Sequence, residues 1–311
     1  MSGTEVIAQL REVIEGDQAP LSAPAQAMAE AIRARHGGAV RALIFYGSAL
    51  REGEAAEKML DFYVIVDSYP AVHGRGLASL AAWLLPPSVH FMAITDADGN
   101  RLRSKYAVVS EAAFLRRASG RSLESMLWAR FTQPATIVTD NPELRARLID
   151  TLAHACRHFA AQVTPLLRGP QQPGDIWVRG LCESYRTELR PENPGPRAAQ
   201  IVARFPERYA RLSAILLPQG KDGAPDLPDV GALRRAACAA KWGLRRIIGK
   251  PLGALRVLKA ATTFDAGLDY ILEKVASHSG VKLDVSEAER RHPVLHAPKL
   301  AWRLYRAGAF R

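Results

Sequence analysis

Residues 39–66 read "AVRALIFYGSALREGEAAEKMLDFYVIV". Two apolar runs, 39–47 and 59–66, carry the aromatic and β-branched residues that β-strands favour. The pair Gly47-Ser48 ends the first run, and Asp61 stands near the start of the second. The stretch therefore predicts two strands connected through a Gly-Ser turn.

Further short apolar runs follow, each bounded by Pro, Gly, Asp or Asn: 88–94, 105–110 and 135–139. Helical patterns come earlier, at 4–15 and 22–36, and the second ends at a Gly pair, as helix C-termini do. The first part of the chain is therefore expected to hold about five strands and flanking helices.

After Asn141 the sequence changes to long stretches rich in Ala, Leu and Arg, which read as helices. Segments rich in Pro and Gly separate these stretches. We therefore expect an α+β fold. Its first domain, residues 1–140, has a mixed sheet with flanking helices, and its second, residues 141–311, is mostly helical.

The composition suggests an anionic partner. The 311 residues carry a formal net charge of +11, which fits nucleic acid, nucleotide phosphates or an acidic membrane surface. No apolar run approaches the roughly 20 residues that cross a bilayer. The amphipathic, acid-containing N-terminus is unlike a signal sequence, so we expect a cytoplasmic location. The three widely spaced cysteines are expected to be reduced and structural.

The Gly-Ser turn and Asp61 together suggest nucleotidyl transfer. Backbone N–H groups at Gly47 and Ser48 can approach a phosphate closely, and Asp61 can hold Mg²⁺ in the same space. Such sites usually carry a second acid two residues after the first, where this chain has Tyr63. The alternative is a plain turn between two buried strands.

A second acid has to come from elsewhere. Asp67 lies roughly 20 Å along the strand from Asp61, too far to bind the same ion. Asp96 and Asp98, after the third predicted strand, are one source, although they also suit an ordinary turn. Glu188 in the predicted helical domain is another.

Several blocks, in order, resemble the mitochondrial-type phosphatidate cytidylyltransferases, the translocator assembly and maintenance family within the nucleotidyltransferase superfamily. They are "FYGSALRE", "KMLDFYVIVD", "LLPPSVHF", "KYAVVS", "LWARFTQPATIV" and "ESYRTELR". The family similarly has an uncharged residue at the position of Tyr63. The resemblance implies a nucleotidyltransferase-like fold and a Mg²⁺-dependent reaction in which CTP and phosphatidic acid give CDP-diacylglycerol and pyrophosphate.

The resemblance also implies roles for individual residues. Asp61, Glu188 and Lys105 would be catalytic, and the two acids would bind Mg²⁺; Glu188 replaces the family's Asp. Those expected to bind phosphate or nucleotide are Gly47, Ser48, Lys58, Arg130, Tyr185 and Arg190. Without the resemblance, Lys58 reads as a solvated loop residue, Lys105 as an edge-strand charge and Arg130 as a helix C-terminal cation.

A basic segment without acids lies between Asp229 and Asp265. It predicts basic amphipathic helices that contact an anionic membrane surface peripherally. The residues expected to make this contact are Arg245, Arg246, Lys250, Arg256 and Lys259. The alternatives are a core helix with a solvated basic face and a groove for nucleic acid. The tail, 296–311, has a similar character.

We therefore expect a CTP:phosphatidate cytidylyltransferase, peripheral on the inner face of a membrane, with no nucleic acid partner. A second hypothesis keeps the fold and changes the acceptor to RNA, a protein or a small molecule. A third is a degenerate nucleotide- or RNA-binding module, and the missing second acid keeps it open.

Overall fold

The computed structural model of the chain describes residues 2–52, 59–189, 193–221, 223–263 and several shorter stretches up to residue 308. Lys58 and Arg190, both expected at the site, lie outside the described residues. No helix in the described ranges combines the length and apolar character needed to cross a membrane.

The predicted strands all form, and they make one mixed sheet of five strands. They are β1 (Val40–Tyr46), β2 (Met59–Val66), β3 (Ser88–Thr95), β4 (Arg101–Ser110) and β5 (Thr136–Val138). Their spatial order is β3-β4-β2-β1-β5, with β2 and β4 parallel and the other pairs antiparallel. The expected α+β class with a mixed sheet is confirmed.

Alternating side chains of the sheet enter two separate cores. One face packs Leu43, Phe62 and Val64 against α2 (Ala23–His36). The opposite face packs Ile44, Tyr63 and other side chains of that parity into a larger cluster with the remaining helices. This alternation follows from the period of two along each strand. It also places Tyr63 on the helix-rich side of the sheet.

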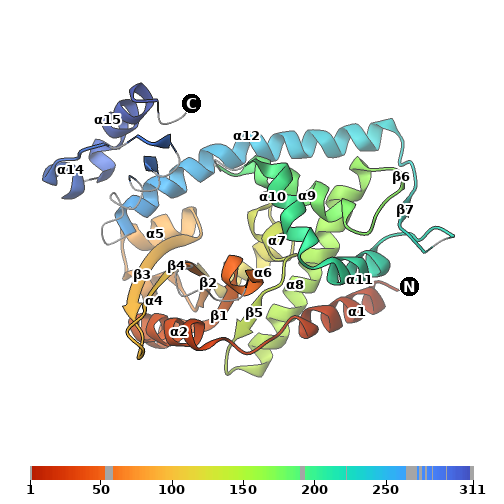
Figure 1. Ribbon diagram of the computed structural model, residues 1–311, viewed down its shortest axis with the longest axis horizontal. Coiled ribbons are helices and arrows are strands. Elements are labelled where there is room, and N and C mark those ends of the chain that lie inside the picture. The colour runs from red at the N-terminus through yellow and green to blue at the C-terminus, as the bar shows by residue number, and fades with distance from the viewer. Residues whose placement is uncertain are drawn as a thin grey trace.

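Further helices surround the sheet and follow it in the chain (Figure 1). The early ones are α1 (Gly3–Gly16), α3 (Ser48–Glu52), α4 (Tyr69–His73), α5 (Leu77–Leu84), α6 (Glu111–Ala118) and α7 (Met126–Arg130). The later ones are α8 (Pro142–Val163), α9 (Asp175–Thr187), α10 (Pro194–Ala203), α11 (Pro206–Leu216), α12 (Ala232–Thr263), α14 (Glu287–Arg291) and α15 (Pro293–Arg306). A small pairing of β6 (Gly169–Pro170) with β7 (Asp226–Leu227) lies between α8 and α12.

The larger core contains residues from both sides of the boundary expected near residue 140. Ile7 and Val13 of α1 share it with Leu152 and Phe159 of α8, and Trp242 of α12 belongs to it as well. A buried ion pair between Arg208 and Asp17 also joins α11 to the end of α1. The two predicted domains therefore contribute to a common apolar interior, which fixes the sheet against the helical layer.

A cluster of histidines lies beside the smaller core. The His90 ring stacks on His73 and Tyr106, with centroid distances of 5.7 and 5.3 Å. His36 contacts the same group, and its Nε2 lies 3.0 Å from the Tyr106 hydroxyl. Burial lowers the pKa of His90 to about 3, helped by the charges of the neighbouring histidines, Arg35 and Lys259.

We expect this cluster to make the protein sensitive to acid. Because the unfolded chain binds a proton at His90 near pH 6.5 and the folded chain does not until about pH 3, stability falls as the pH drops through that window. The loss is about 1.4 kcal/mol per pH unit for such a histidine. Urea unfolding between pH 7 and 4 measures it. His90→Gln should make the free energy of unfolding fall less steeply between pH 6.5 and 4.

Candidate active site

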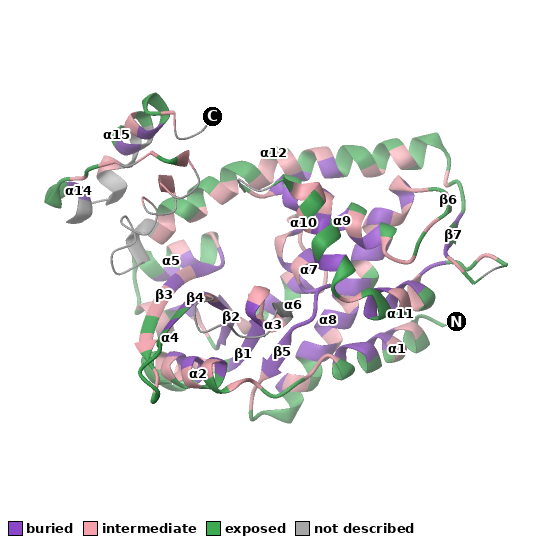
Figure 2. Cartoon of the chain, in the orientation of Figure 1, coloured by how far each residue is buried: buried purple, intermediate pink, exposed green. Residues whose placement is uncertain are grey.

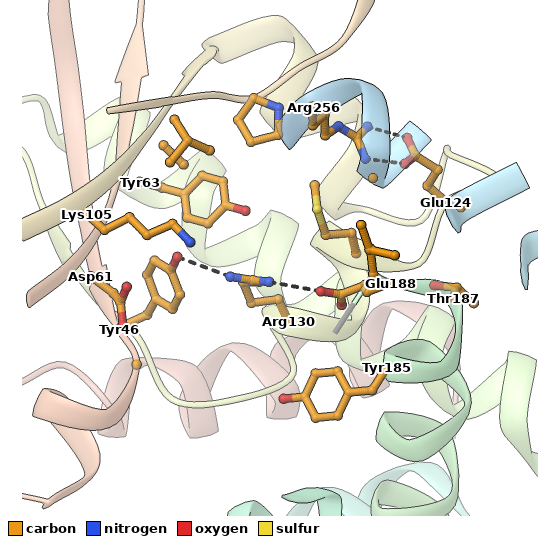
Figure 3. Close-up of a pocket in the computed structure, with 18 of the residues that line it drawn as sticks. Tyr46, Asp61, Tyr63, Lys105, Glu124, Arg130, Tyr185, Thr187, Glu188 and Arg256 are labelled. Atoms are coloured by element: carbon orange, nitrogen blue, oxygen red, sulfur yellow. Dashed lines mark hydrogen bonds and ion pairs between the residues drawn. The ribbon is translucent and has the colours of Figure 1, made fainter. Parts of the chain in front are cut away.

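One cavity, of about 430 Å³, lies between the sheet and the helical layer (Figure 3). Its walls come from β1, β2 and β4 on one side and from α7, α10, α12 and the end of α9 on the other. Among the residues expected at the site, those that line it are Gly47, Asp61, Lys105, Arg130, Tyr185 and Glu188. Segments far apart in the sequence therefore converge on one space.

The sheet register places a row of polar side chains along one wall. Asp61 lies opposite Tyr46 of β1 and opposite Lys105 of β4. Directly paired residues of neighbouring strands point to the same face of a sheet, so a carboxylate, a phenol and an ammonium stand side by side. Figure 3 shows the Lys105 side chain reaching over Tyr46 and Asp61. The row combines an anion that can bind a cation with a cation that can bind a phosphate.

Gly47 follows this row and has a backbone that other residues rarely adopt. Its φ is +98°, and an added Cβ would lie 2.5 Å from Oδ2 of Asp61. Glycine is therefore needed both for the turn and for the close approach of the chain to the carboxylate. Ser48 begins α3 directly afterwards and is not among the residues that line the cavity.

Arg130 joins the sheet to the helical layer. Arg130 is the last residue of α7. Its guanidinium donates a hydrogen bond to the Tyr46 hydroxyl at 3.1 Å and lies 3.5 Å from the Glu188 carboxylate. Burial lowers the pKa of Arg130, but Tyr63, Tyr46 and Glu188 outweigh that effect, and the net shift is upward. The guanidinium therefore stays charged inside the cavity, where it can bind an anionic group.

Tyr46, which is half-buried, and the buried Tyr63 lie in the same wall, with ring centroids 5.2 Å apart. Burial raises the pKa of both hydroxyls above the ordinary value of 10.0. Tyr63 is therefore neutral at physiological pH. Two residues after Asp61 the cavity therefore offers no negative charge and no strong base.

Glu188 comes to the cavity directly after α9 ends at Thr187. Tyr185, one turn earlier, lines the same space. Glu188 thus lies across the cavity from Asp61, with Arg130 between the two walls in Figure 3. The other acids considered from the sequence do not join them.

Asp96 and Asp98 are turn residues. The Asp96 carboxylate accepts hydrogen bonds from the backbone N–H of Asp98 at 3.0 Å and of Asn100 at 2.8 Å, within the β3–β4 connection. Desolvation raises the pKa of Asp96, but its hydrogen bonds with Asn100 and Asp98 together outweigh that effect, and the net shift is downward. Neither aspartate lines the cavity. The turn interpretation is therefore the one that the structure supports.

The available donors suit Mg²⁺ that arrives with a nucleotide. This ion commonly keeps several waters and binds one or two carboxylates together with substrate phosphates. Asp61 and Glu188 are the candidate carboxylates. Within the described part of the chain, no group of three or more His, Cys, Asp or Glu side chains is arranged to hold a metal.

The expectation that the basic residues of α12 contact a membrane is wrong for most of them. Arg245 is buried, donates to the Leu123 carbonyl and stacks on Trp242 with its guanidinium 4.6 Å from the ring centroid. Arg246 pairs with the buried Glu183. These side chains point toward the protein because hydrogen-bond acceptors, a buried carboxylate and an aromatic ring lie on that side of α12.

Arg256 and Lys259 also face inward. Arg256 forms two hydrogen bonds with Glu124, at 2.6 and 2.9 Å, and a third with the Pro86 carbonyl. Lys259 donates to the Pro87 carbonyl at 3.1 Å, and burial lowers the pKa of its ammonium to about 8. Of the five residues expected at a membrane, Lys250 is the exposed one.

Sequence reasoning also missed how α12 closes the cavity. Gly249, Gly253, Arg256 and Val257 line it, and a Cβ added at Gly249 would collide with the Thr187 carbonyl oxygen. α12 therefore approaches the residues beside Glu188 more closely than any side chain at position 249 would allow. The spacing of the two glycines, one helical turn apart, is the signal that was present in the sequence.

Gly249→Ala should therefore destabilise the protein by roughly 1 to 3 kcal/mol, because the added methyl group forces α12 away from Thr187. Gly243, also inside α12, is the matched control, since a Cβ there meets no atom within 4 Å. Gly243→Ala should be neutral or stabilising by up to about 1 kcal/mol, because alanine has the higher helix propensity. Urea unfolding of the two variants measures the difference, and equal stabilities would contradict the close packing.

The chain was also compared with known proteins. No family model matches it, and no curated protein sequence matches it.

Proposed function

We propose that this chain is a magnesium-dependent nucleotidyltransferase, and that its reaction is the transfer of CMP from CTP to phosphatidic acid. The observation that carries the proposal is the convergence of Asp61, Lys105, Arg130 and Glu188 beside the Gly47 turn. These residues come from separate segments; the Gly-Ser turn and its spacing predicted Asp61 for this chemistry, and the family resemblance implied the other three. The products would be CDP-diacylglycerol and pyrophosphate.

The polar groups of the cavity divide into two kinds. Asp61 and Glu188 would hold Mg²⁺, which when bound neutralises phosphate charge. Lys105 and Arg130 are cations that would bind the phosphates directly, and Arg130 is held rigidly by Tyr46 and Glu188. Gly47 would let backbone N–H groups approach the phosphates, because no side chain intervenes. Catalysis would then rest on positioning and on charge stabilisation.

The neutral Tyr63 favours an acceptor that needs no base. A phosphate monoester such as phosphatidic acid is already anionic and can attack the α-phosphorus of CTP without losing a proton to the protein. A hydroxyl acceptor would need a base near the attacking oxygen. Burial raises the pKa of Tyr63 and removes it from that role. A lipid acceptor would require the protein to work peripherally at a membrane surface, which we place at its inner, cytoplasmic face.

Pyrophosphate release with Mg²⁺, CTP and phosphatidic acid in vesicles tests the reaction. Asp61→Asn should lower the rate at least about a hundredfold, because a bound cation loses its charged ligand. Asp67→Asn is the matched control: this exposed acid follows the same strand and does not line the cavity. It should leave the rate unchanged. Release that does not depend on lipid, or that Asp61→Asn leaves intact, would contradict the proposal.

The role of Glu188 is tested by how the rate of pyrophosphate release depends on the Mg²⁺ concentration. Glu188→Gln should raise the Mg²⁺ concentration needed for half-maximal rate about tenfold or more, because one of two carboxylate ligands is lost. Glu188→Asp keeps the charge and should recover part of the effect. Glu207→Gln on α11 is the control, since Glu207 is exposed and does not line the cavity. An unchanged Mg²⁺ requirement in Glu188→Gln would remove Glu188 from the metal site.

A further inference from the structure

Three buried hydroxyl groups lie where the start of α7 meets the end of α9. They belong to Ser125, the residue before α7, and to Ser184 and Thr187 in the last turn of α9. The three residues are 1%, 1% and 4% exposed, and the adjoining parts of both helices are largely buried (Figure 2). A hydroxyl group taken out of water destabilises the fold unless it finds a hydrogen-bond partner.

These hydroxyls form a chain of hydrogen bonds whose direction follows from one fixed end. Thr187 Oγ1 donates to the Ser184 carbonyl at 2.7 Å, so its proton is used. Ser125 Oγ lies 3.2 Å from Thr187 Oγ1 and is therefore the donor of that pair. Ser184 Oγ in turn donates to Ser125 Oγ at 2.9 Å. Each of the three protons has one acceptor, and a shift of either helix end would break at least one bond.

The elements joined by this hydroxyl chain are also held from outside. Glu124, directly before the start of the chain, forms ion pairs with Arg117 of α6 and Arg256 of α12. At the end of α9, the Thr187 carbonyl lies against Gly249 of α12. The outer contacts fix each helix end to its own neighbours, and the hydroxyl chain fixes the two ends to each other.

Both helices carry a residue of the candidate site. Glu188 directly follows Thr187, and Arg130 lies five residues after Ser125, at the other end of α7. The Arg130 guanidinium and the Glu188 carboxylate are 3.5 Å apart at the cavity, which Thr187 also lines (Figure 3). Helix α7 spans roughly 8 Å and acts as a rigid spacer. The place of Ser125 relative to Thr187 therefore sets the place of Arg130 relative to Glu188.

Hydrogen bonds determine this placement in a way that apolar packing does not. Burial of apolar surface is non-directional, whereas a hydrogen bond restricts both a distance and an angle. A fully satisfied polar chain inside an apolar layer therefore specifies one arrangement of the two helix ends. Charged groups of a working site have to stay within about 0.5 Å of their productive positions.

We propose that the hydroxyl chain of Ser125, Ser184 and Thr187 is a positioning device that holds Glu188 against Arg130 at the cavity. All three hydroxyl protons are used within the chain, so these residues act through the ion pair and are not themselves catalytic. The effect on the ion pair follows from the packing alone. The effect on Mg²⁺ rests on the proposed function.

The coupling between Arg130 and Glu188 tests the positioning without any reaction. A double-mutant cycle of Arg130→Met and Glu188→Gln, measured by urea unfolding, gives the factor by which the pair changes the unfolding equilibrium constant. We expect a factor of about fivefold in the original chain and about twofold or less when the cycle is repeated with Thr187→Val. Thr187→Ser keeps the hydroxyl and should restore the factor. Ser125→Ala removes the middle hydroxyl and should act as Thr187→Val does.

Thr151→Val on α8 is the matched control. Thr151 is also buried, and its hydroxyl donates to the Arg147 carbonyl at 2.8 Å, but it does not line the cavity. Its removal should leave the coupling unchanged. An unchanged coupling in Thr187→Val, or an equal fall in Thr151→Val, would overturn the proposal. Circular dichroism establishes that each variant is folded.

The Mg²⁺ dependence of pyrophosphate release connects the hydroxyl chain to the reaction. Thr187→Val should raise the Mg²⁺ concentration for half-maximal rate about threefold to tenfold, and Thr187→Ser should restore it. Combined with Glu188→Gln, Thr187→Val should add no further increase, because its effect passes through the carboxylate that is already lost. An additive increase would contradict a positioning role that acts through Glu188.

The two kinds of measurement separate the positioning device from the reaction. If the coupling falls in Thr187→Val but the original chain neither binds CTP nor releases pyrophosphate, the proposed reaction fails and the positioning device stands. If pyrophosphate release depends on Mg²⁺ and on Glu188, but Thr187→Val changes neither the coupling nor the Mg²⁺ requirement, the positioning device fails and the reaction stands.

Discussion

A guanidinium keeps its proton under all ordinary conditions, so an arginine that is buried must be surrounded by acceptors. Arg130 meets this requirement with groups from two layers: the Tyr46 hydroxyl on β1 and the Glu188 carboxylate after α9. If either layer shifted, Arg130 would lose one of these two partners. Arg130 therefore ties the helical layer to the sheet at the cavity, within the frame that the shared apolar core sets.

The same constraint explains why the site is complete only in the whole fold. Asp61 and Lys105 are fixed by strand register, which is set by the hydrophobic pattern of β2 and β4. Glu188 is fixed by the end of α9, and α9 is in turn held by the close approach of α12 at Gly249. Each polar group thus depends on apolar packing some distance away.

The strands and the cluster of site residues could be predicted from the sequence. Short runs of β-branched and aromatic residues favour β-strands, and β2 has the same bounds as its apolar run. Asp61, Lys105, Arg130 and Glu188 do meet in one cavity. What could not be predicted was the direction in which charged side chains point. A basic amphipathic pattern says that arginines share a side of α12, but not that Glu124 and Glu183, far away in the chain, turn that side inward.

The course of the chain has a consequence for how this protein can evolve. Helix α1 begins the chain, yet Ile7 and Val13 share a core with α8, and Asp17 pairs with Arg208 of α11. The sheet lies between these segments in the sequence. The two parts are therefore interleaved, and a gene break near residue 140 would separate each from surface that it needs to fold. We therefore expect the two parts to evolve together through point substitutions. Exchanging either part for a domain from another gene would remove residues of the shared core.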